Sequence, residues 1–282
     1  MSSVLLQSVG GAPGFSTASY PATAGTSGNA LVSDGTDWTS TNSISANFTF
    51  TSAVSGATET VTVSNTSDTA SSAANILSQV AGSTAADPTF QSSISGGQAY
   101  TWGIDNSDSD AFVVAASSAL GTTNVMRVAT TGEINYPLQS CFMGVLSGDD
   151  LNATGDGTTF TLGSGNAFTE VFDQNGDFVT TGTYTCPVTS RVQLNVNCMV
   201  TGIGAGMTLG HINLVTSNRT IELFDINYFV CQNGSAQISA NGSMLMDMDA
   251  NDTASVTIRI AGGTKTADLR GSSCLFSGFI AC

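Results

Sequence analysis

The feature that most constrains the fold is a strict alternation of apolar and polar residues over residues 191–200, which read RVQLNVNCMV. Successive side chains of an extended chain point to opposite sides, so Val192, Leu194, Val196, Cys198 and Val200 share one face. An apolar face opposite a polar face predicts a strand of an antiparallel sheet that covers a core. Residues 254–262, which read ASVTIRIAG, repeat the pattern.

Other segments of the C-terminal half predict further strands. Residues 210–229 read as two strands around a turn at 217–219. The final stretch, CLFSGFIAC, is apolar on both faces and predicts a central strand covered on both sides. About eight strands separated by Gly, Asn and Asp turns are typical of a two-sheet sandwich or jelly roll.

Composition narrows the class of partner. Charged residues make up 10% of the 282 residues and hydrophobic residues 41%, which indicates a structured chain rich in β-structure. The net charge of -15 argues against nucleic acid and against an acidic membrane surface. No stretch is long enough to predict insertion into a bilayer. The start, MSSVLLQSVGGAPG, lacks a basic region, so we expect no signal peptide and synthesis in a cytoplasm.

The chain divides into three predicted parts. Residues 1–46 are rich in turn residues and indicate either a flexible leader or an attachment segment. Residues 47–137 contain alternating stretches such as TETVTV, in which Val61 and Val63 face one way. This apolar stripe is too thin for a self-sufficient domain, so several intertwined copies would have to bury it. Residues 138–282 contain all six cysteines and the strands described above.

Two stretches of the middle part resemble a known class of protein. GIDNSDSDAFVVAASSALGT, followed by VMRVATTGEINYPLQ, resembles a module of bacteriophage tail and head fibres. The earlier AGTSGNALVSDGTDW is similar to short repeats of such fibres. This resemblance implies an all-β protein with an elongated, intertwined, trimeric β shaft.

The C-terminal part resembles the tumour-necrosis-factor-like jelly roll, in the version found as the globular head of complement and collagen-like proteins. The resemblance lies in EVFDQNGDF, GTYTCPVTSRVQLNVN, MDANDTASVTI and LFSGFIAC. Gly182, Tyr184, Pro187, Asn251–Asp252 and Phe276–Phe279 stand at the positions of the family's motifs. It implies a C-terminal homotrimeric knob of this fold.

The same resemblance implies a cysteine arrangement. In the family's fold the first and last strands lie side by side, which would bring Cys141 near Cys282. We therefore expect these two cysteines to pair in an oxidising medium. Cys198 faces the core in this interpretation and is expected to stay reduced.

Candidate chemistry is sparse. His211 is the only histidine, and it is expected to be structural or solvated rather than catalytic. The acidic run 247–252 lacks the glycine of an EF-hand loop and has Ile258 where the closing Glu should stand, which leaves only a looser calcium site as an alternative. No nucleotide-binding or zinc-protease motif is present. We therefore predict no catalytic residue, no bound metal, no cofactor and no enzyme activity.

The function predicted from these features is that of a structural, homotrimeric virion fibre protein of a phage tail or head. Residues 1–46 would contact other virion proteins, and the knob on the virion surface would bind a host-surface glycan or protein. One alternative is a cellular surface adhesin or matrix filament subunit with a lectin-like head. Another is a glycan depolymerase, which would require paired carboxylates in a groove.

The predicted binding surface is the end of the knob farthest from the shaft. Connections of an antiparallel jelly roll alternate between its two ends, which assigns the loops 201–208, 231–236 and 263–273 to this tip. The candidate receptor-binding residues on these loops are Lys265, Asp268, Arg270, Asn233 and Thr208. Basic groups there suit anionic glycans, although charges on an exposed loop also serve solubility.

Overall fold

The computed structural model describes residues 6–9, 12–15, 30–33, 38–41, 58, 60–227 and 236–282. Side chains are described from residue 58 onward. Within these ranges the chain is all-β, with one short 3-10 helix, η1 (Gly271–Ser273). No helix in the described ranges is long and apolar enough to cross a membrane.

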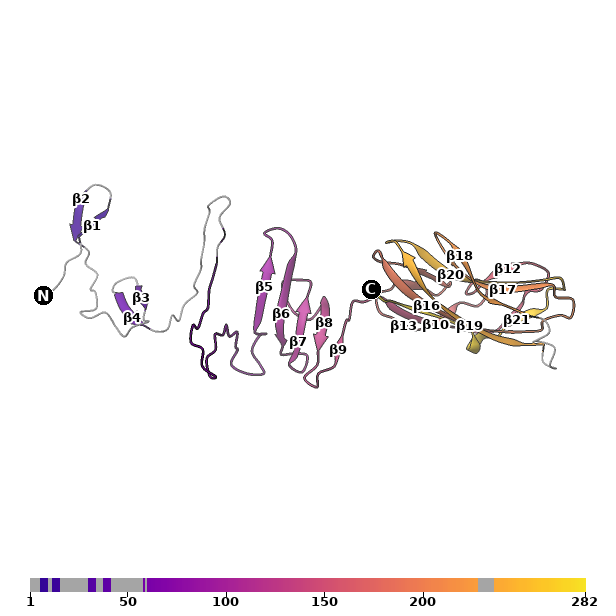
Figure 1. Ribbon diagram of the computed structural model, residues 1–282, viewed down its shortest axis with the longest axis horizontal. Coiled ribbons are helices and arrows are strands. Elements are labelled where there is room, and N and C mark those ends of the chain that lie inside the picture. Colours follow the sequence, from indigo (N-terminus) through magenta and orange to yellow (C-terminus); the bar gives the residue numbers. More distant parts are fainter. Residues whose placement is uncertain are drawn as a thin grey trace. The chain divides into compact units, whose positions relative to one another are not determined.

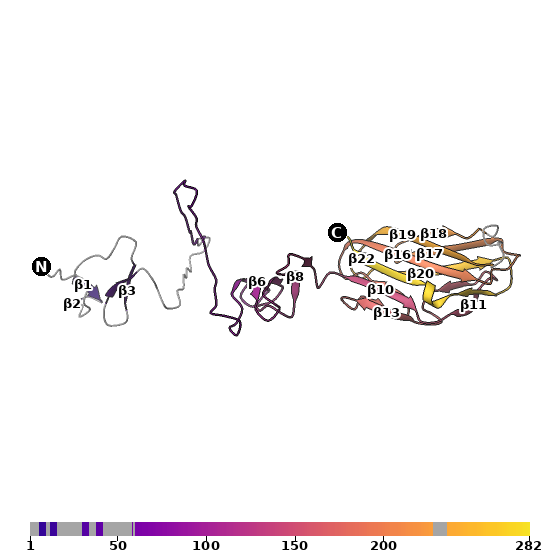
Figure 2. The same cartoon turned by 90° about the horizontal axis from the view of Figure 1, so that it is seen from below.

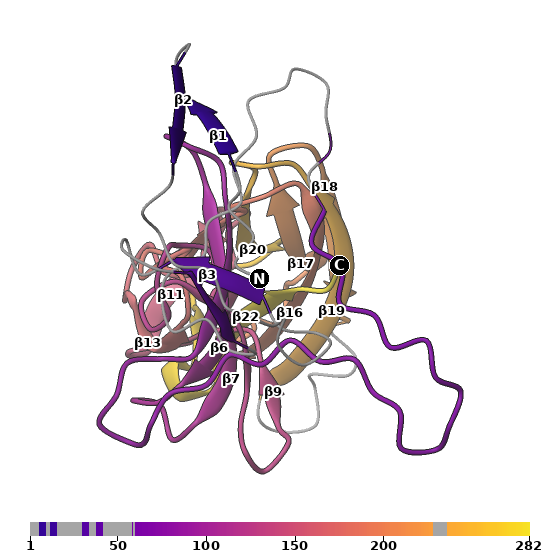
Figure 3. The ribbon, with the colours of Figure 1, turned by 90° about the vertical axis from the view of Figure 1, so that its left-hand side faces the viewer.

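Contacts divide the chain into two units, residues 1–76 and 77–282. The first unit contains two short antiparallel hairpins, β1 (Leu6–Val9) with β2 (Ala12–Phe15), and β3 (Ala30–Ser33) with β4 (Trp38–Thr41). Figure 3 shows β1 and β2 side by side. The boundary expected near residue 46 lies outside the described residues.

The second unit begins with a five-stranded antiparallel sheet in chain order (Figure 1). Its strands are β5 (Thr89–Ser93), β6 (Ala99–Asp105), β7 (Ala111–Ala115), β8 (Asn124–Val128) and β9 (Ile134–Asn135). One face of this sheet is buried by other segments of the same chain. On it, at most 1% of the surface is exposed for each of Thr101, Ala111, Val113 and Ala115.

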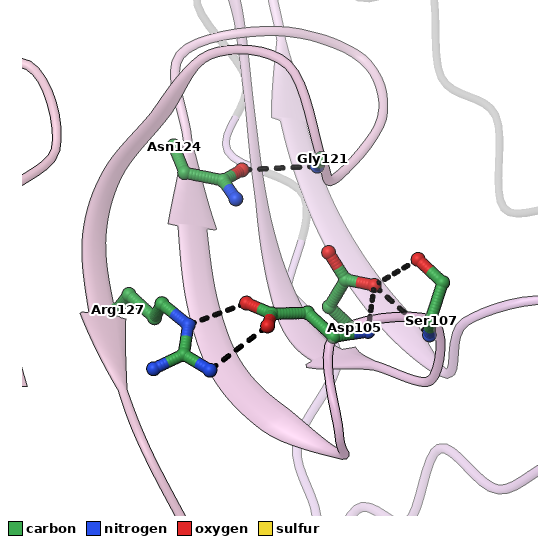
Figure 4. Close-up of polar contacts among 6 residues, drawn as sticks. Asp105, Ser107, Gly121, Asn124 and Arg127 are labelled. Atoms are coloured by element: carbon green, nitrogen blue, oxygen red, sulfur yellow. Dashed lines mark hydrogen bonds and ion pairs between the residues drawn. The ribbon is translucent and has the colours of Figure 1, made fainter.

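Polar loops cover this closed face. The Thr101 hydroxyl donates to the Ser117 carbonyl at 2.8 Å, and the Gln91 amide donates to the Ser118 carbonyl at 2.9 Å. The buried Asp105 carboxylate accepts hydrogen bonds from the Ser107 hydroxyl at 2.7 Å and from the backbone N–H of Asp108 at 3.1 Å (Figure 4). Buried polar groups must be paired, so these bonds hold the loop of residues 105–110 against the sheet.

The opposite face of the five-stranded sheet is apolar and open. Two cross-strand rows form it, and every member is half-buried or exposed in the single chain: Phe90, Trp102, Val114 and Met126, then Ile104, Phe112, Val128 and Ile134. Phe112 and Ile134 expose 36% and 56% of their surface. We call these eight residues the apolar face.

The rest of the second unit is a two-sheet sandwich (Figures 1 and 2). The first sheet has the strand order β11-β21-β16-β22-β10-β13 with β19 also paired to β16: β10 (Cys141–Leu146), β11 (Asp150–Thr154), β13 (Phe168–Asp173), β16 (Ser190–Thr201), β19 (Ile238–Met248), β21 (Ala267–Leu269) and β22 (Leu275–Ile280). The second has the order β14-β15-β20-β17-β18 with β12 paired to β20: β12 (Thr159–Thr161), β14 (Phe178–Val179), β15 (Thr183–Thr185), β17 (Leu209–Thr216), β18 (Thr220–Asp225) and β20 (Thr253–Ala261).

The pairing of the long strands is nested along the chain. β10 pairs with β22, β15 with β20, β16 with β19, and β17 with β18. Nested antiparallel pairs split over two sheets are the topology of a jelly roll, so the fold expected for this part is confirmed. The core lies between the sheets, where Phe142 stacks on Tyr184 and meets Phe276 edge-on. The five apolar residues of the alternating stretch 191–200 all face this core, as predicted.

Two strand predictions need correction. Residues 60–64 form no strand, and Val61 and Val63 expose 64% and 48% of their surface, because none of the described strands pairs with this segment. The final strand is central, as expected, but only one of its faces is covered. Phe276 is fully buried, whereas Phe279 on the opposite face is 45% exposed.

We expect Asp105→Ala to destabilise the five-stranded sheet by about 2 kcal/mol, because it removes a buried charged acceptor and leaves backbone N–H groups unpaired. Hydrogen exchange of the amides of β7 should become roughly 30-fold faster. The matched control is Asp110→Asn, since Asp110 is exposed and its positive φ of 58° suits asparagine. Equal exchange rates in both variants would contradict the role assigned to Asp105.

The stability of the five-stranded sheet should depend on pH through the ion pair of Arg127 with Asp108. The Arg127 guanidinium donates a hydrogen bond of 2.8 Å to the Asp108 carboxylate (Figure 4). The hydrogen bond from Arg127 lowers the pKa of Asp108 below its ordinary value of 3.8. The pair therefore stabilises the sheet at neutral pH, and this contribution is lost as the pH falls through the lowered value. A carboxyl titration by NMR should show this lowering, and Arg127→Gln should abolish it. An ordinary pKa for Asp108 in the unaltered protein would overturn the assignment.

Candidate functional site

The chain enters and leaves the sandwich at the same end (Figures 1 and 2). The Ile280 backbone N–H donates to the Ser140 carbonyl at 3.1 Å, and the Gln139 amide donates to the Ile280 carbonyl at 2.7 Å. The first and last strands are thus antiparallel neighbours, as expected. Loop 263–273, one of the loops assigned to the tip, leads into the other end of β22.

The predicted tip loops contact one another. The Thr266 hydroxyl donates to the Gly202 carbonyl at 3.1 Å, which joins loop 263–273 to loop 201–208. The Ile203 N–H donates to the carbonyl of Ala236 at 3.1 Å, which joins loop 201–208 to the end of loop 231–236. Loops 201–208 and 263–273, together with Ala236, therefore form one surface, which we call the tip. Residues 231–235 of the third predicted loop lie outside the described residues.

The predicted binding residues have different environments. Lys265 and Thr208 are exposed. Asp268 is half-buried in strand β21, where its carboxylate accepts a hydrogen bond of 2.7 Å from the Asn152 N–H, so it is a structural acceptor rather than a free loop side chain. Asn233 lies outside the described residues.

Arg270 is partnered. Its guanidinium lies 2.7 Å from a carboxylate oxygen of Asp149, and its backbone N–H donates to the Met199 carbonyl at 3.0 Å. Gly271 donates to the same Asp149 side chain at 2.8 Å. Arg270 therefore links the segment before β22 to Asp149 and to Met199 of β16. Of the two basic residues predicted on this loop, Arg270 forms an ion pair and Lys265 forms none among the described ion pairs.

The sequence analysis missed one loop of the tip, residues 155–158. The Gly263 N–H donates to the Gly155 carbonyl at 3.0 Å. Gly155 has a φ of +132°, and a Cβ there would lie 2.0 Å from the Thr264 carbonyl oxygen, so only glycine fits. Hydrogen bonds from Thr158 lower the pKa of Asp156, and the positive charge of Lys265 contributes to the same shift. The Gly-Asp-Gly turn at 155–157 was the available signal.

The tip therefore carries a negatively charged and a positively charged side chain. Asp156 and Lys265 are exposed on adjoining loops, and the described ion pairs include none made by Lys265. A cation beside a carboxylate, surrounded by hydroxyl and backbone groups, offers hydrogen bonds to a polar ligand.

The other candidate chemistry is structural. His211 lies on the outer face of β17 with its Nδ1 3.8 Å from a Glu222 oxygen. The Asp252 carboxylate accepts hydrogen bonds from the Asn218 amide at 2.6 Å and from the Asp249 N–H at 2.9 Å, which closes the turn after β19. Within the described ranges no three His, Cys, Asp or Glu side chains are grouped as metal ligands would be.

A second surface emerges from the strand register of the first sheet. Three adjacent cross-strand rows of its outer face have no charged side chain, and the next row pairs Arg191 with Asp247. The uncharged rows are Cys141, Phe279, Gln193 and Leu245; Phe172, Met143, Ser277, Asn195 and Ser243; Thr169, Val145, Leu275, Asn197 and Asn241. The half formed by β13, β10 and β22 is mainly apolar, and the half formed by β16 and β19 carries mainly amides and hydroxyls. We call this surface the uncharged face.

Comparison with known proteins gives likenesses of fold alone. No known family matches the chain. No curated protein matches it either. The globular domain of zebrafish complement 1qA protein is similar to 51% of this chain and 98% of its own, with 16% identity and a TM-score of 0.35. Two crystal structures of murine APRIL, at pH 8.0 and pH 8.5, each cover 50% of this chain and 98% of their own, with 13% and 12% identity and a TM-score of 0.35. The jelly-roll assignment rests on the strand pairing, not on these likenesses.

Proposed function

We propose that this chain is the subunit of a homotrimeric fibre on the surface of a virion, in the first instance a phage, and that its C-terminal sandwich binds a host-surface glycan. Residues 1–46 would contact other virion proteins. The observation that carries the proposal is that the chain has two sheet faces suited to contact with further copies of itself. It also has a polar tip suited to a ligand.

The apolar face of the five-stranded sheet is the first support. Full burial of each large apolar side chain contributes about 1.5–3 kcal/mol, and eight of them remain half-buried or exposed in a single chain. Soluble proteins rarely leave so continuous an apolar surface in water. Packing three copies around a common axis would bury it, and would also offer strand partners to the unpaired segment around Val61 and Val63.

The uncharged face of the sandwich is the second support. At -15 per chain, contact between copies is opposed by repulsion wherever acidic groups meet. The three rows of the uncharged face avoid that repulsion, and their amides can form hydrogen bonds between copies. The sequence of β22, apolar on both sides, fits a strand whose inner side meets the core and whose outer side meets another copy.

The tip supports ligand binding. Lys265 offers a charge-assisted hydrogen bond to a carboxylate, sulfate or phosphate of a surface glycan, while Asp156 and Thr208 offer acceptors for sugar hydroxyls. Three tips on a trimer, and several fibres on a particle, would convert weak individual contacts into firm attachment. The proposal assigns no catalytic step to the chain.

The first expected outcome concerns assembly. Light scattering should give a mass near 86 kDa for the full chain, three times the 28.6 kDa of one chain. Phe112→Asp combined with Phe279→Asp should yield monomers, because both variants place a charge on a face between copies. Val179→Asp is the matched control, since Val179 is 52% exposed on strand β14 of the other sheet. A monomeric unaltered protein, or dissociation by the control, would refute the assembly.

The second expected outcome concerns attachment. Lys265→Ala should reduce adsorption of reconstituted particles to host cells at least tenfold while the trimer stays intact. Arg270→Ala should weaken adsorption much less, because that guanidinium is already paired with Asp149. Adsorption that is unchanged by Lys265→Ala would place recognition elsewhere. Electron microscopy of intact particles with an antibody to this chain tests the virion assignment separately, since an adhesin would decorate cells instead.

A further inference from the structure

Two buried thiols meet inside the sandwich. The sulfur atoms of Cys198 and Cys274 lie 3.4 Å apart, and neither residue has exposed surface. Cys198 belongs to β16, and Cys274 directly precedes β22. The register pairs Asn197 with Leu275, so Cys198 and Cys274 stand opposite each other at the next position of the same two strands.

The backbone spacing at this position suits a disulfide. Directly opposed residues of antiparallel strands have Cα atoms about 4.5–5.5 Å apart, within the roughly 4.4–6.8 Å that a disulfide spans. A disulfide bond is about 2.05 Å long, so the two sulfur atoms, now 3.4 Å apart, need to approach by only about 1.4 Å. Small side-chain rotations supply such a movement without a change of strand register.

The pairing expected between Cys141 and Cys282 is not supported by the register. Cys141 lies opposite Phe279, and the Cys282 carbonyl accepts the Arg191 N–H beside β16. Three residues along an extended strand amount to about 10 Å, which exceeds the span of a disulfide. Cys186 is also separate, because its thiol donates to the Val188 carbonyl at 3.0 Å.

We propose that Cys198 and Cys274 are the site of an intrachain disulfide, formed by exchange with a low-molecular-weight disulfide, which fastens β22 to β16. This inference is independent of the proposed function. It reverses the expectation that Cys198 stays reduced.

The step balances as a thiol–disulfide exchange. The Cys274 thiolate attacks one sulfur of glutathione disulfide, the disulfide bond breaks, and one glutathione leaves as a thiol after taking up a proton. Cys198 then loses its proton and attacks the Cys274 sulfur of the mixed disulfide, which releases the second glutathione. Two protein thiols are oxidised, and one small disulfide is reduced to two thiols.

The contact between the two thiols favours this order. The hydrogen bond between them lowers the pKa of Cys274 and raises that of Cys198. Cys274 is therefore the thiol that ionises first and acts as the nucleophile. Since both thiols are buried, exchange in the folded chain requires the segment Gly271–Ser273 to open. During refolding, before β22 has docked, the two thiols are not in contact and either one attacks first.

The bond would close a loop between positions separated by 76 residues. Chain-entropy arguments for a loop of this length give an unfolded population that is about a thousand-fold smaller. The fastened strand also carries Leu275 and Phe279 of the uncharged face, so the bond would hold that face in register.

The test uses the full chain, unfolded and refolded with glutathione disulfide, then blocked with N-ethylmaleimide and cut after Lys and Arg. We expect peptide 192–219, which contains Cys198, to be linked to peptide 271–282, and four of the six cysteines to be alkylated. Because peptide 271–282 contains both Cys274 and Cys282, Cys282→Ser is the matched control and should retain the link. Cys274→Ala should abolish it.

A second measurement does not depend on the folding of variants. Oxidised protein should unfold at a higher urea concentration than the same preparation kept in dithiothreitol. Exchange with the folded, reduced protein should be slow and should accelerate in mild urea. Full alkylation of the Cys198 peptide after oxidative refolding, a link joining the Cys141 and Cys282 peptides in its place, or identical unfolding curves would each overturn the proposal.

Discussion

The pairing of β22 with both β10 and β16 places the last residues of the chain in the middle of a sheet, and the rest of the sandwich depends on it. Phe276 of this strand is fully buried and meets the rings of Phe142 and Phe178. The C-terminal strand of the sandwich therefore completes both the hydrogen-bonding ladder and the aromatic core. Folding of the sandwich depends on contacts that are distant in sequence, because its first strand, β10, pairs with its last strand, β22.

The same strand connects the core to the surface. Its inner residues complete the packing, while Leu275, Ser277 and Phe279 form the middle of the uncharged face. A contact between Cys198 and Cys274 lies at the start of the strand, and the Arg270–Asp149 ion pair lies just before it. One strand thus links the stability of the sandwich to the surface through which copies are proposed to assemble.

The five-stranded sheet and the first sheet of the sandwich each have one covered face and one open face, but they are covered in different ways. In the five-stranded sheet, polar loops held by Asp105 and Gln91 close one face and leave the other apolar. In the sandwich, a second sheet closes the inner face and leaves an outer face of mixed apolar and amide character. Strongly acidic chains repel one another, so surfaces without charge are the ones on which copies can meet at low electrostatic cost.

The sequence alone determined the alternating strands of the sandwich and the sense of their faces. Alternation is a local property, because each residue's side is set by its neighbours, and Val192 to Val200 accordingly point inward as predicted. The turn at 217–219 was readable for the same reason. The glycine turn at 155–157 carried a signal that was not used.

Only the tertiary structure decided which residues lie opposite one another on neighbouring strands. The position of a partner depends on register between strands that are 76 residues apart, and no local pattern encodes it. For this reason the thiol opposite Cys198 and the Asp149 partner of Arg270 were not foreseen. Val61 was assigned to a strand, but none of the described strands pairs with its segment. Local chemistry fixes the elements, and long-range pairing fixes their contacts.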